Sequence, residues 1–292
     1  MDTAYAHGVG EPLRDPALAI RWAYDPLLVV FLVAVALYLR GLRRRRGGGR
    51  TIRPWQVAAY LAGMTVLIAT LVPPLDTWAD ELFSLHMVQH LLITLVGIPL
   101  VVLGAPYAVI LRGLPPAARR RVVLPLARSR WLHRALGALQ APLAALLLYE
   151  TVMWVWHVPR LYDAALRSSG VHLLEHGCMA LAALNLWRAV LDPWPLRSRV
   201  PPPARLLVLA GMTVLDVGLA ALLSFSAASW YAYGGLPSPA WWPLGRLEDQ
   251  RLGGLIMWVP GGLVELVALA ATFAVWAARE SRSPAAVSSY EC

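Results

Sequence analysis

The sequence predicts an all-α membrane protein, a polytopic bundle of seven transmembrane helices, and three observations lead to this prediction. Hydrophobic residues make up 58% of the 292 residues, whereas soluble domains contain about 45–50%. Seven apolar runs are separated by loops that hold most of the 26 basic residues, all of which are arginine. A net charge of +9 would favour nucleic-acid binding in a soluble chain. Because the arginines lie in the loops, we expect the lipid bilayer and not nucleic acid as their partner.

The seven spans are identified by their length and their low content of charge. They cover residues 26–39, 55–72, 82–103, 139–158, 171–190, 204–225 and 253–278. The first run is short, and Trp22 and Tyr24 extend it as interfacial anchors. We expect one transmembrane domain over residues 26–278, with an extracytoplasmic tail of residues 1–25 and a cytoplasmic tail of residues 279–292.

Arginine placement predicts the orientation of the bundle. Of the 26 arginines, 20 lie after the first, third and fifth spans and in the C-terminal tail, and six lie on the other side. The positive-inside rule therefore places the N-terminus outside and the C-terminus in the cytoplasm. Residues 115–134 mix arginine with apolar residues and are expected along the inner interface. The aromatic residues 230–242 are expected at the outer headgroup level.

Five of the seven histidines are predicted to lie at one depth, near the outer end of the bundle. His86 and His90 open the third span, His157 ends the fourth, and His172 and His176 open the fifth. Residues four apart share one face of a helix, so each pair can chelate one ion. A single histidine near a helix end is more often hydrogen-bonded than ligating, and the predicted metal or haem site depends on all five occurring together. His7 and His133 receive no role.

Copper is the metal that this set favours. Met153 and Met257 are additional candidate ligands at the same end of the bundle, although methionines in spans usually serve packing. Imidazole and thioether ligands together favour copper, especially the cuprous ion. Cys178 and Cys292 are far apart, and no Cys-x-x-Cys motif is present.

Four acidic residues fall within predicted spans: Glu150, Glu175, Asp216 and Glu265. We expect Glu150, Asp216 and Glu265 to line a polar interior, to pair with one another or to relay protons, because ionisable residues in spans are costly and usually functional. Glu175 lies between His172 and His176 but is predicted to point about 100° away from His176 on the helix.

Four segments together resemble the CtaG-type cytochrome c oxidase assembly factors of bacteria: SLHMVQHLLITLVGIPLVVLGAP, LLYETVMWVWHVPRLYDAAL, HLLEHGCMALAALNLWRAVLDP and LEDQRLGGLIMWVPGG. The motifs within them are H-x-x-x-H at His86, W-H-x-P at Trp156, H-x-x-E-H at His172 and D-Q-x-x-G-G-x-x-M-W at Asp249. The resemblance covers residues 25–278. It implies a seven-span protein of the bacterial plasma membrane that assists maturation of haem–copper oxidases, often with copper handling.

The leading hypothesis is therefore a copper-binding assembly factor, not an enzyme, with oxidase subunits and a periplasmic or extracellular copper donor as partners. Copper transfer is expected to need exposed, labile coordination. A haem-binding electron-transfer protein, a copper or proton transporter, a metal-dependent hydrolase using Glu150 or Glu175, and an oxidase-docking scaffold remain as alternatives. The shared-site hypothesis requires the five histidines to lie within about 10 Å of a common point, with the third, fourth and fifth spans as neighbours.

Overall fold

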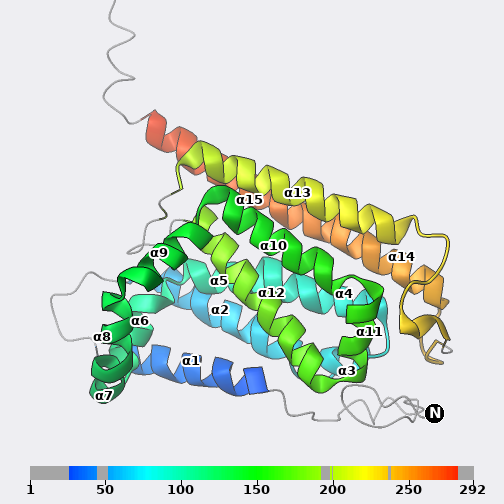
Figure 1. The fold of residues 1–292 in the computed structure, drawn as a ribbon, viewed down its shortest axis with the longest axis horizontal. Helices are drawn as coiled ribbons and strands as arrows, with labels where there is room; N and C mark the ends of the chain where they lie inside the picture. Colours follow the sequence, from blue (N-terminus) through cyan, green and yellow to red (C-terminus); the bar gives the residue numbers. More distant parts are fainter. Residues whose placement is uncertain (1–25, 45–51, 192–197, 199, 236–237, 282–292) are drawn as a thin grey trace, which may run out of the picture.

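The computed structural model describes residues 26–44, 52–191, 198, 200–235 and 238–281, and every regular element within these ranges is helical (Figure 1). A helix, or a chain of helical segments, occupies each of the seven ranges predicted as spans. They are α1 (Pro26–Arg43), α2 (Pro54–Thr70), α4–η2–α5 (Phe83–Leu91, Leu92–Gly97, Ile98–Leu103), α10 (Pro142–Trp156), α12 (Ser169–Val190), α13 (Pro202–Ser224) and α14–η5–α15 (Arg246–Ile256, Met257–Gly261, Gly262–Glu280).

Shorter helices connect these long ones. They are α3 (Leu75–Ala79), α6 (Pro106–Gly113), α7 (Pro116–Ala118), η3 (Arg119–Val123), α8 (Leu124–Arg128), α9 (Arg130–Leu139), α11 (Pro159–Arg167) and η4 (Ala232–Gly235). Proline at the first or second position starts several of them, since its missing N–H would be unpaired there in any case.

By length and composition, four helical units of the described chain can cross a membrane: α1, α4 to α5, α13 and α14 to α15. A fifth appears if α9 and α10, which meet at a bend of 73°, count as one unit, and α2 is a shorter apolar helix. With 22 residues α12 is long enough, but two histidines, Glu175 and Arg188 reduce its apolar character. The all-helical architecture is confirmed, and its long apolar helices indicate a membrane protein. The number of seven spans and the orientation of the termini stay predictions.

The last long helix begins earlier than the sequence suggested. It starts at Arg246 rather than at residue 253, so the D-Q-x-x-G-G motif is helical. Glu248 and Asp249 lie in the first turn, where carboxylates interact favourably with the helix dipole. Buried polar contacts of Asp249 and Gln250 then allow this charged turn to continue into the apolar helix.

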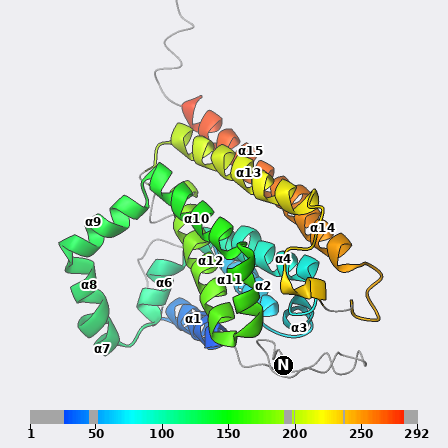
Figure 2. The ribbon, with the colours of Figure 1, turned by 45° about the vertical axis from the view of Figure 1, so that its right-hand side comes forward.

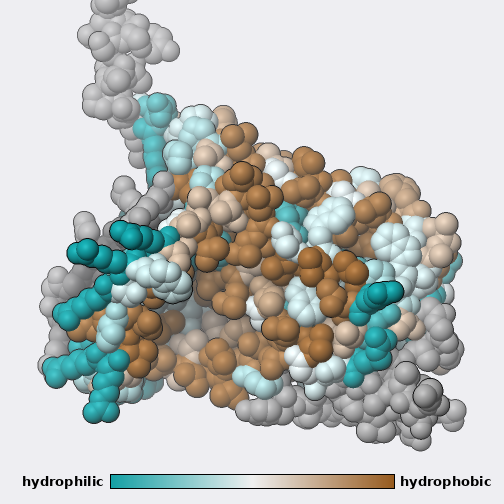
Figure 3. All heavy atoms as spheres, viewed as in Figure 1, coloured by the Kyte–Doolittle hydropathy of each residue, from teal (hydrophilic) through white to brown (hydrophobic). Residues whose placement is uncertain are grey.

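Helices α7 to α9 form an arm that stands away from the bundle (Figure 2). None of their residues is buried. The arm combines arginines with exposed apolar side chains such as Leu126 and Trp131, which are 51% and 75% exposed. On the face shown in Figure 3, hydrophilic side chains gather over this arm and apolar side chains cover the middle of the bundle. This composition agrees with the interfacial placement predicted for residues 115–134, which stays a prediction.

Candidate metal centre

The five histidines predicted to converge do so, at the end of the bundle where α4 and α12 begin and α10 ends. All five are buried, with at most 4% of each exposed. The ring centroids of His86 and His90 are 4.3 Å apart, and those of His172 and His176 are 4.1 Å apart. The four-residue spacing on each helix therefore places two imidazoles side by side, edge to face in the first pair and tilted in the second, as expected for residues on one helical face.

The two pairs face each other across the interface between α4 and α12. The centroid of His86 lies 5.4 Å from that of His172, and the centroid of His90 lies 5.5 Å from that of His176. His157, the residue that ends α10, lies 6.1 Å from His90 by the same measure. The three spans are thus joined at one point, which satisfies the geometric requirement of a shared site.

Two sets of residues hold their ligand atoms close enough to bind one ion. The first is His86, His172 and His176, and the second is His86, His90 and Glu175, and within each set the ligand atoms lie within 4.8 Å of one another. His86 belongs to both sets and is therefore the centre of the cluster.

Glu175 is a member of the cluster that the leading hypothesis did not include among the metal ligands. Its two carboxylate oxygens lie 3.8 Å from the Nε2 atoms of His86 and His90, and its side chain is fully buried. Glu175 is offset from His176 by about 100° around the axis of α12. Its side chain still faces α4, where it meets His86 and His90. The sequence indicates this role by placing an acidic residue between two histidines of an otherwise apolar segment.

Backbone carbonyls orient two of the rings. The Nδ1 atom of His157 lies 2.6 Å from the carbonyl oxygen of Met153, and that of His86 lies 3.3 Å from the carbonyl oxygen of Ala79. A carbonyl can only accept, so Nδ1 carries the proton in the neutral ring and Nε2 keeps its lone pair. This arrangement is the usual support for a histidine that binds metal through Nε2.

Three methionines are buried near the centre. Met87, which adjoins His86 in sequence, is fully buried and places its Sδ 3.3 Å from Nε2 of His157. Met153 is buried and orients His157 through its carbonyl, while Met257 packs in the apolar cluster that contains Phe83 and Met87. Ligation by Met153 or Met257 stays a prediction, and Met87 is the thioether that meets a histidine nitrogen.

Several polar atoms of the centre lack hydrogen-bond partners among the described residues. They are Nε2 of His86, both ring nitrogens of His90 and both carboxylate oxygens of Glu175. Buried polar atoms without partners cost about 1–3 kcal/mol each. A bound cation would satisfy the carboxylate oxygens and the unprotonated nitrogen of each neutral ring, so the donor set fits a soft or borderline metal ion.

Tyrosines from α11 and from residues 231–233 cover the centre. The ring of Tyr162 lies 4.9 Å from that of His86 by centroids, and the Tyr162 and Tyr231 rings are 4.3 Å apart. Tyr231 donates a hydrogen bond to the carbonyl of His157, and Tyr233 donates one to the carbonyl of Ala79. Burial raises the pKa of all three phenols above their usual value, so they stay neutral. The exposed coordination expected for transfer is therefore absent in this conformation of the described residues.

The D-Q-x-x-G-G motif holds the first turn of α4 in place. Asp249 accepts hydrogen bonds from the backbone N–H of Phe83 at 2.8 Å and from Oγ of Ser84 at 2.5 Å. It acts as an N-cap supplied by another helix. A side chain on Gly253 would collide with the ring of Phe83, and one on Gly254 would collide with Ser224 of α13. The motif thus allows α14 to approach α4 closely and fixes the position of His86.

The three acidic residues predicted for the bundle interior also meet, deeper than the histidines. Glu150 of α10, Asp216 of α13 and Glu265 of α15 are buried, with 5%, 9% and 2% exposed. Their carboxyl groups are close enough to interact, and Glu265 contacts the side chains of both Asp216 and Thr213. The polar interior is as expected, while proton relay along it stays a prediction.

Comparison with known proteins identifies the family of this chain. The model of the cytochrome c oxidase caa3 assembly factor family, Caa3_CtaG, matches residues 36–279. The chain belongs to this family. The matched range contains all five histidines of the centre, as well as Glu175 and Asp249. Membership agrees with the resemblance noted from the four sequence segments.

Curated relatives occur in mycobacteria. An uncharacterized protein of Mycobacterium leprae is 26% identical over 96% of this chain and 44% of its own length. Uncharacterized proteins of Mycobacterium bovis and Mycobacterium tuberculosis are each 27% identical over 96% of this chain and 43% of theirs. The chain therefore spans less than half the length of these relatives. No solved structure matches it.

Proposed function

We propose that this protein assists cytochrome c oxidase assembly by binding copper as cargo at the histidine centre and delivering it to an oxidase subunit. The observation that carries the proposal is the convergence of five buried histidines and Glu175 from three helices. Family membership supports the oxidase as the partner. The protein acts as a metallochaperone and not as a catalyst.

The ligand chemistry favours copper over harder ions. Imidazole nitrogens dominate the centre, and the Met87 thioether lies against His157. Calcium and magnesium prefer sets of oxygen ligands, and Glu175 is the single carboxylate of the two candidate sets. Nitrogen and thioether donors suit copper, particularly Cu(I).

The predicted topology supplies the direction of delivery. With seven spans and the N-terminus outside, the histidine centre lies toward the extracytoplasmic side of the bacterial plasma membrane. Copper then arrives from a periplasmic or extracellular donor without crossing the bilayer, and oxidase subunits receive it on the same side.

The spacing of the imidazoles argues against haem. The pairs best separated to ligate an iron axially from opposite sides are His90 with His157, whose ring centroids are 6.1 Å apart, and His86 with His176, whose centroids are 6.2 Å apart. The rings of His86 and His90 lie only 4.3 Å apart, so each occupies space that a porphyrin bound by the other pair would need.

Metal analysis of the detergent-purified protein tests this proposal. After anaerobic Cu(I) loading we expect about one copper per chain, bound by soft ligands, and an ultraviolet–visible spectrum without a Soret band. The double variant His86→Ala/His90→Ala should lose this copper. The control His133→Ala, at an exposed histidine of α9, should keep it.

Three outcomes would contradict the proposal. Copper retained by the double variant would exclude the histidine centre, a Soret band would indicate the haem protein, and the absence of bound metal would leave a scaffold function. In cells lacking the native protein, the double variant should also fail to restore copper-loaded oxidase, whereas His133→Ala should restore it.

A further inference from the structure

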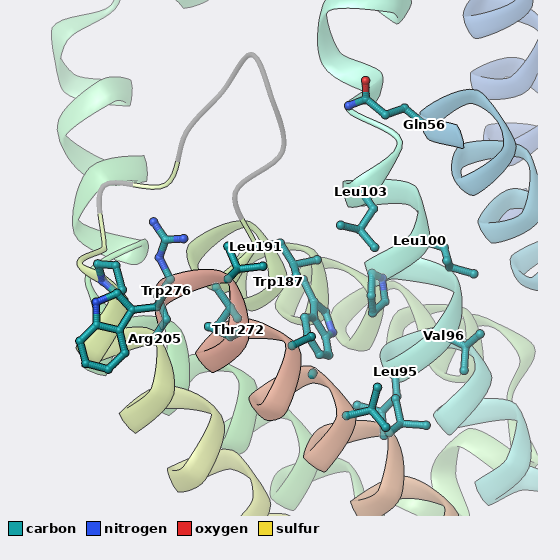
Figure 4. Close-up of a pocket in the computed structure, with 18 of the residues that line it drawn as sticks. Gln56, Leu95, Val96, Leu100, Leu103, Trp187, Leu191, Arg205, Thr272 and Trp276 are labelled. Atoms are coloured by element: carbon teal, nitrogen blue, oxygen red, sulfur yellow. The ribbon is translucent and has the colours of Figure 1, made fainter. Parts of the chain in front are cut away.

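A cavity of about 1120 Å³ lies at the end of the bundle opposite the histidine centre (Figure 4). Its walls come from the C-terminal halves of three long helical units and the first turns of α2 and α13. Leu100 and Leu103 of α5 form one side, and Thr272 and Trp276 of α15 form the other. Trp187 of α12 lies between them and donates its Nε1 hydrogen to the carbonyl of Thr94, 2.8 Å away.

Three arginines line the same cavity although its walls are otherwise mostly apolar. Arg53 precedes α2, Arg205 lies in the first turn of α13, and Arg279 lies in the last turn of α15. All three positions are at helix ends on the arginine-rich side of the bundle. Nε of Arg205 donates to the carbonyl of Val200 at 2.8 Å, which anchors this guanidinium at the cavity. The lining is therefore amphipathic, with positive charge at one end and hydrocarbon along its length.

We propose that this cavity binds one anionic phospholipid, with its phosphate at the three arginines and its acyl chains along α5 and α15. Guanidinium groups form strong, charge-assisted hydrogen bonds with phosphate oxygens. Basic pockets between transmembrane helices on the cytoplasmic side are typical sites for anionic headgroups. Trp55 and Trp276, which also line the cavity, are the residue type that marks the headgroup level.

The size and openness of the site fit a lipid better than a soluble metabolite. Pockets for small soluble ligands hold about 300–1,000 Å³, and this cavity is larger. Val267 and Val275 of α15, which line it, remain 60% and 51% exposed. An acyl chain would cover this hydrocarbon, whereas a hydrophilic anion such as free phosphate would contact only the arginines.

Charge also separates a lipid from a transmembrane helix of a partner. The cytoplasmic ends of transmembrane helices carry an excess of arginine and lysine. Such a helix would place its positive end against Arg53, Arg205 and Arg279, and like charges repel. An anionic lipid presents the opposite charge at that level.

Native mass spectrometry of the purified full chain tests the proposal. Delipidated protein is titrated with phosphatidylglycerol or phosphatidylcholine of identical acyl chains, and the one-lipid adduct is measured. We expect phosphatidylglycerol to bind at least about tenfold more tightly. Inorganic phosphate at the same concentration should not displace it, because the acyl chains contribute to binding.

Two variants locate the site. Arg53→Gln/Arg279→Gln should weaken phosphatidylglycerol binding by about tenfold, while Arg119→Gln/Arg120→Gln, with the same charge change on the exposed arm, should not. Ala271→Trp, which fills the cavity without changing charge, should also weaken it. The proposal would be overturned if the two lipids bound equally tightly, or if both arginine double variants lost phosphatidylglycerol affinity equally. Full phosphatidylglycerol binding by Ala271→Trp would also overturn it. Copper content should be unchanged in all three variants, so the two proposals fail independently.

Discussion

Replacing Asp249 with alanine should destabilise the protein and weaken copper binding together, because this carboxylate caps the helix that carries His86. Asp249 accepts one hydrogen bond from the N–H of Phe83 and one from the hydroxyl of Ser84. Both donors would be left buried without their partner, at about 1–3 kcal/mol each. Loss of a helix N-cap alone costs about 0.5–2 kcal/mol. We therefore expect the free energy of unfolding to fall by about 3 kcal/mol.

The effect on copper follows from the position of the cap. His86 lies in the first turns of α4 and belongs to both candidate ligand sets. If the first turn loosens, His86 loses its fixed orientation, and removal of such supporting groups typically lowers metal affinity by about 10–100-fold. Competition with a Cu(I) chelator measures this affinity, and equilibrium unfolding in mixed micelles measures stability.

Glu248→Ala is the matched control for this experiment. It removes a carboxylate from the adjacent position, but that side chain is exposed, so stability should change by less than about 0.5 kcal/mol. A free energy of unfolding for Asp249→Ala within about 0.5 kcal/mol of the unmodified protein would refute the assigned capping role. Normal stability with lost copper would show that Asp249 acts on the metal by another route.

Three further changes have expected outcomes. Glu175→Gln removes the negative charge of the side chain but keeps its shape. Cu(I) affinity measured by competition should therefore fall by about 10-fold or more without a loss of thermal stability. Unchanged affinity would show that Glu175 is not part of the centre. Gly253→Ala should lower the free energy of unfolding by about 1–3 kcal/mol through overpacking against Phe83. The control Gly137→Ala has open space around it and should stabilise α9 by up to about 1 kcal/mol. Equal unfolding midpoints for the two variants would contradict this prediction. Tyr233→Phe should cost about 1 kcal/mol and speed copper release in stopped-flow chelation, and an unchanged release rate would exclude it as part of the cover.

The positions of the helices and the pairing of histidines within one helix were predictable because both depend on local spacing, and the meeting of the pairs was expected from their common depth in the bundle. Apolar runs mark the helices, and a four-residue interval is enough to place His86 beside His90. Contacts between distant segments were not predictable in this way. Asp249 and Ser84 are 165 residues apart, and no periodicity within either helix identifies the other as its partner.

The composition of the centre was predicted less completely for the same reason. The imidazoles were identified by residue type. The role of Met87 was not predictable, because its contact with His157 depends on how α4 packs against the end of α10. The tyrosine cover was expected only as an interfacial aromatic segment. Tyr231 and Tyr233 reach the centre because their hydroxyls bond to two particular carbonyls, a pairing that amphipathic patterning does not encode.

The hydroxyl bonds of Tyr231 and Tyr233 have a consequence for the rate at which a bound ion exchanges with the surroundings. Both bonds end on carbonyls next to the centre, those of His157 and Ala79, and Ala79 is also the residue that orients His86. An ion held there leaves only when this segment moves, and that movement disturbs the ligand at the same time. Release would then be slow in isolation and fast when a recipient engages residues 231–233, so a reactive metal would pass between proteins without a free interval in solution.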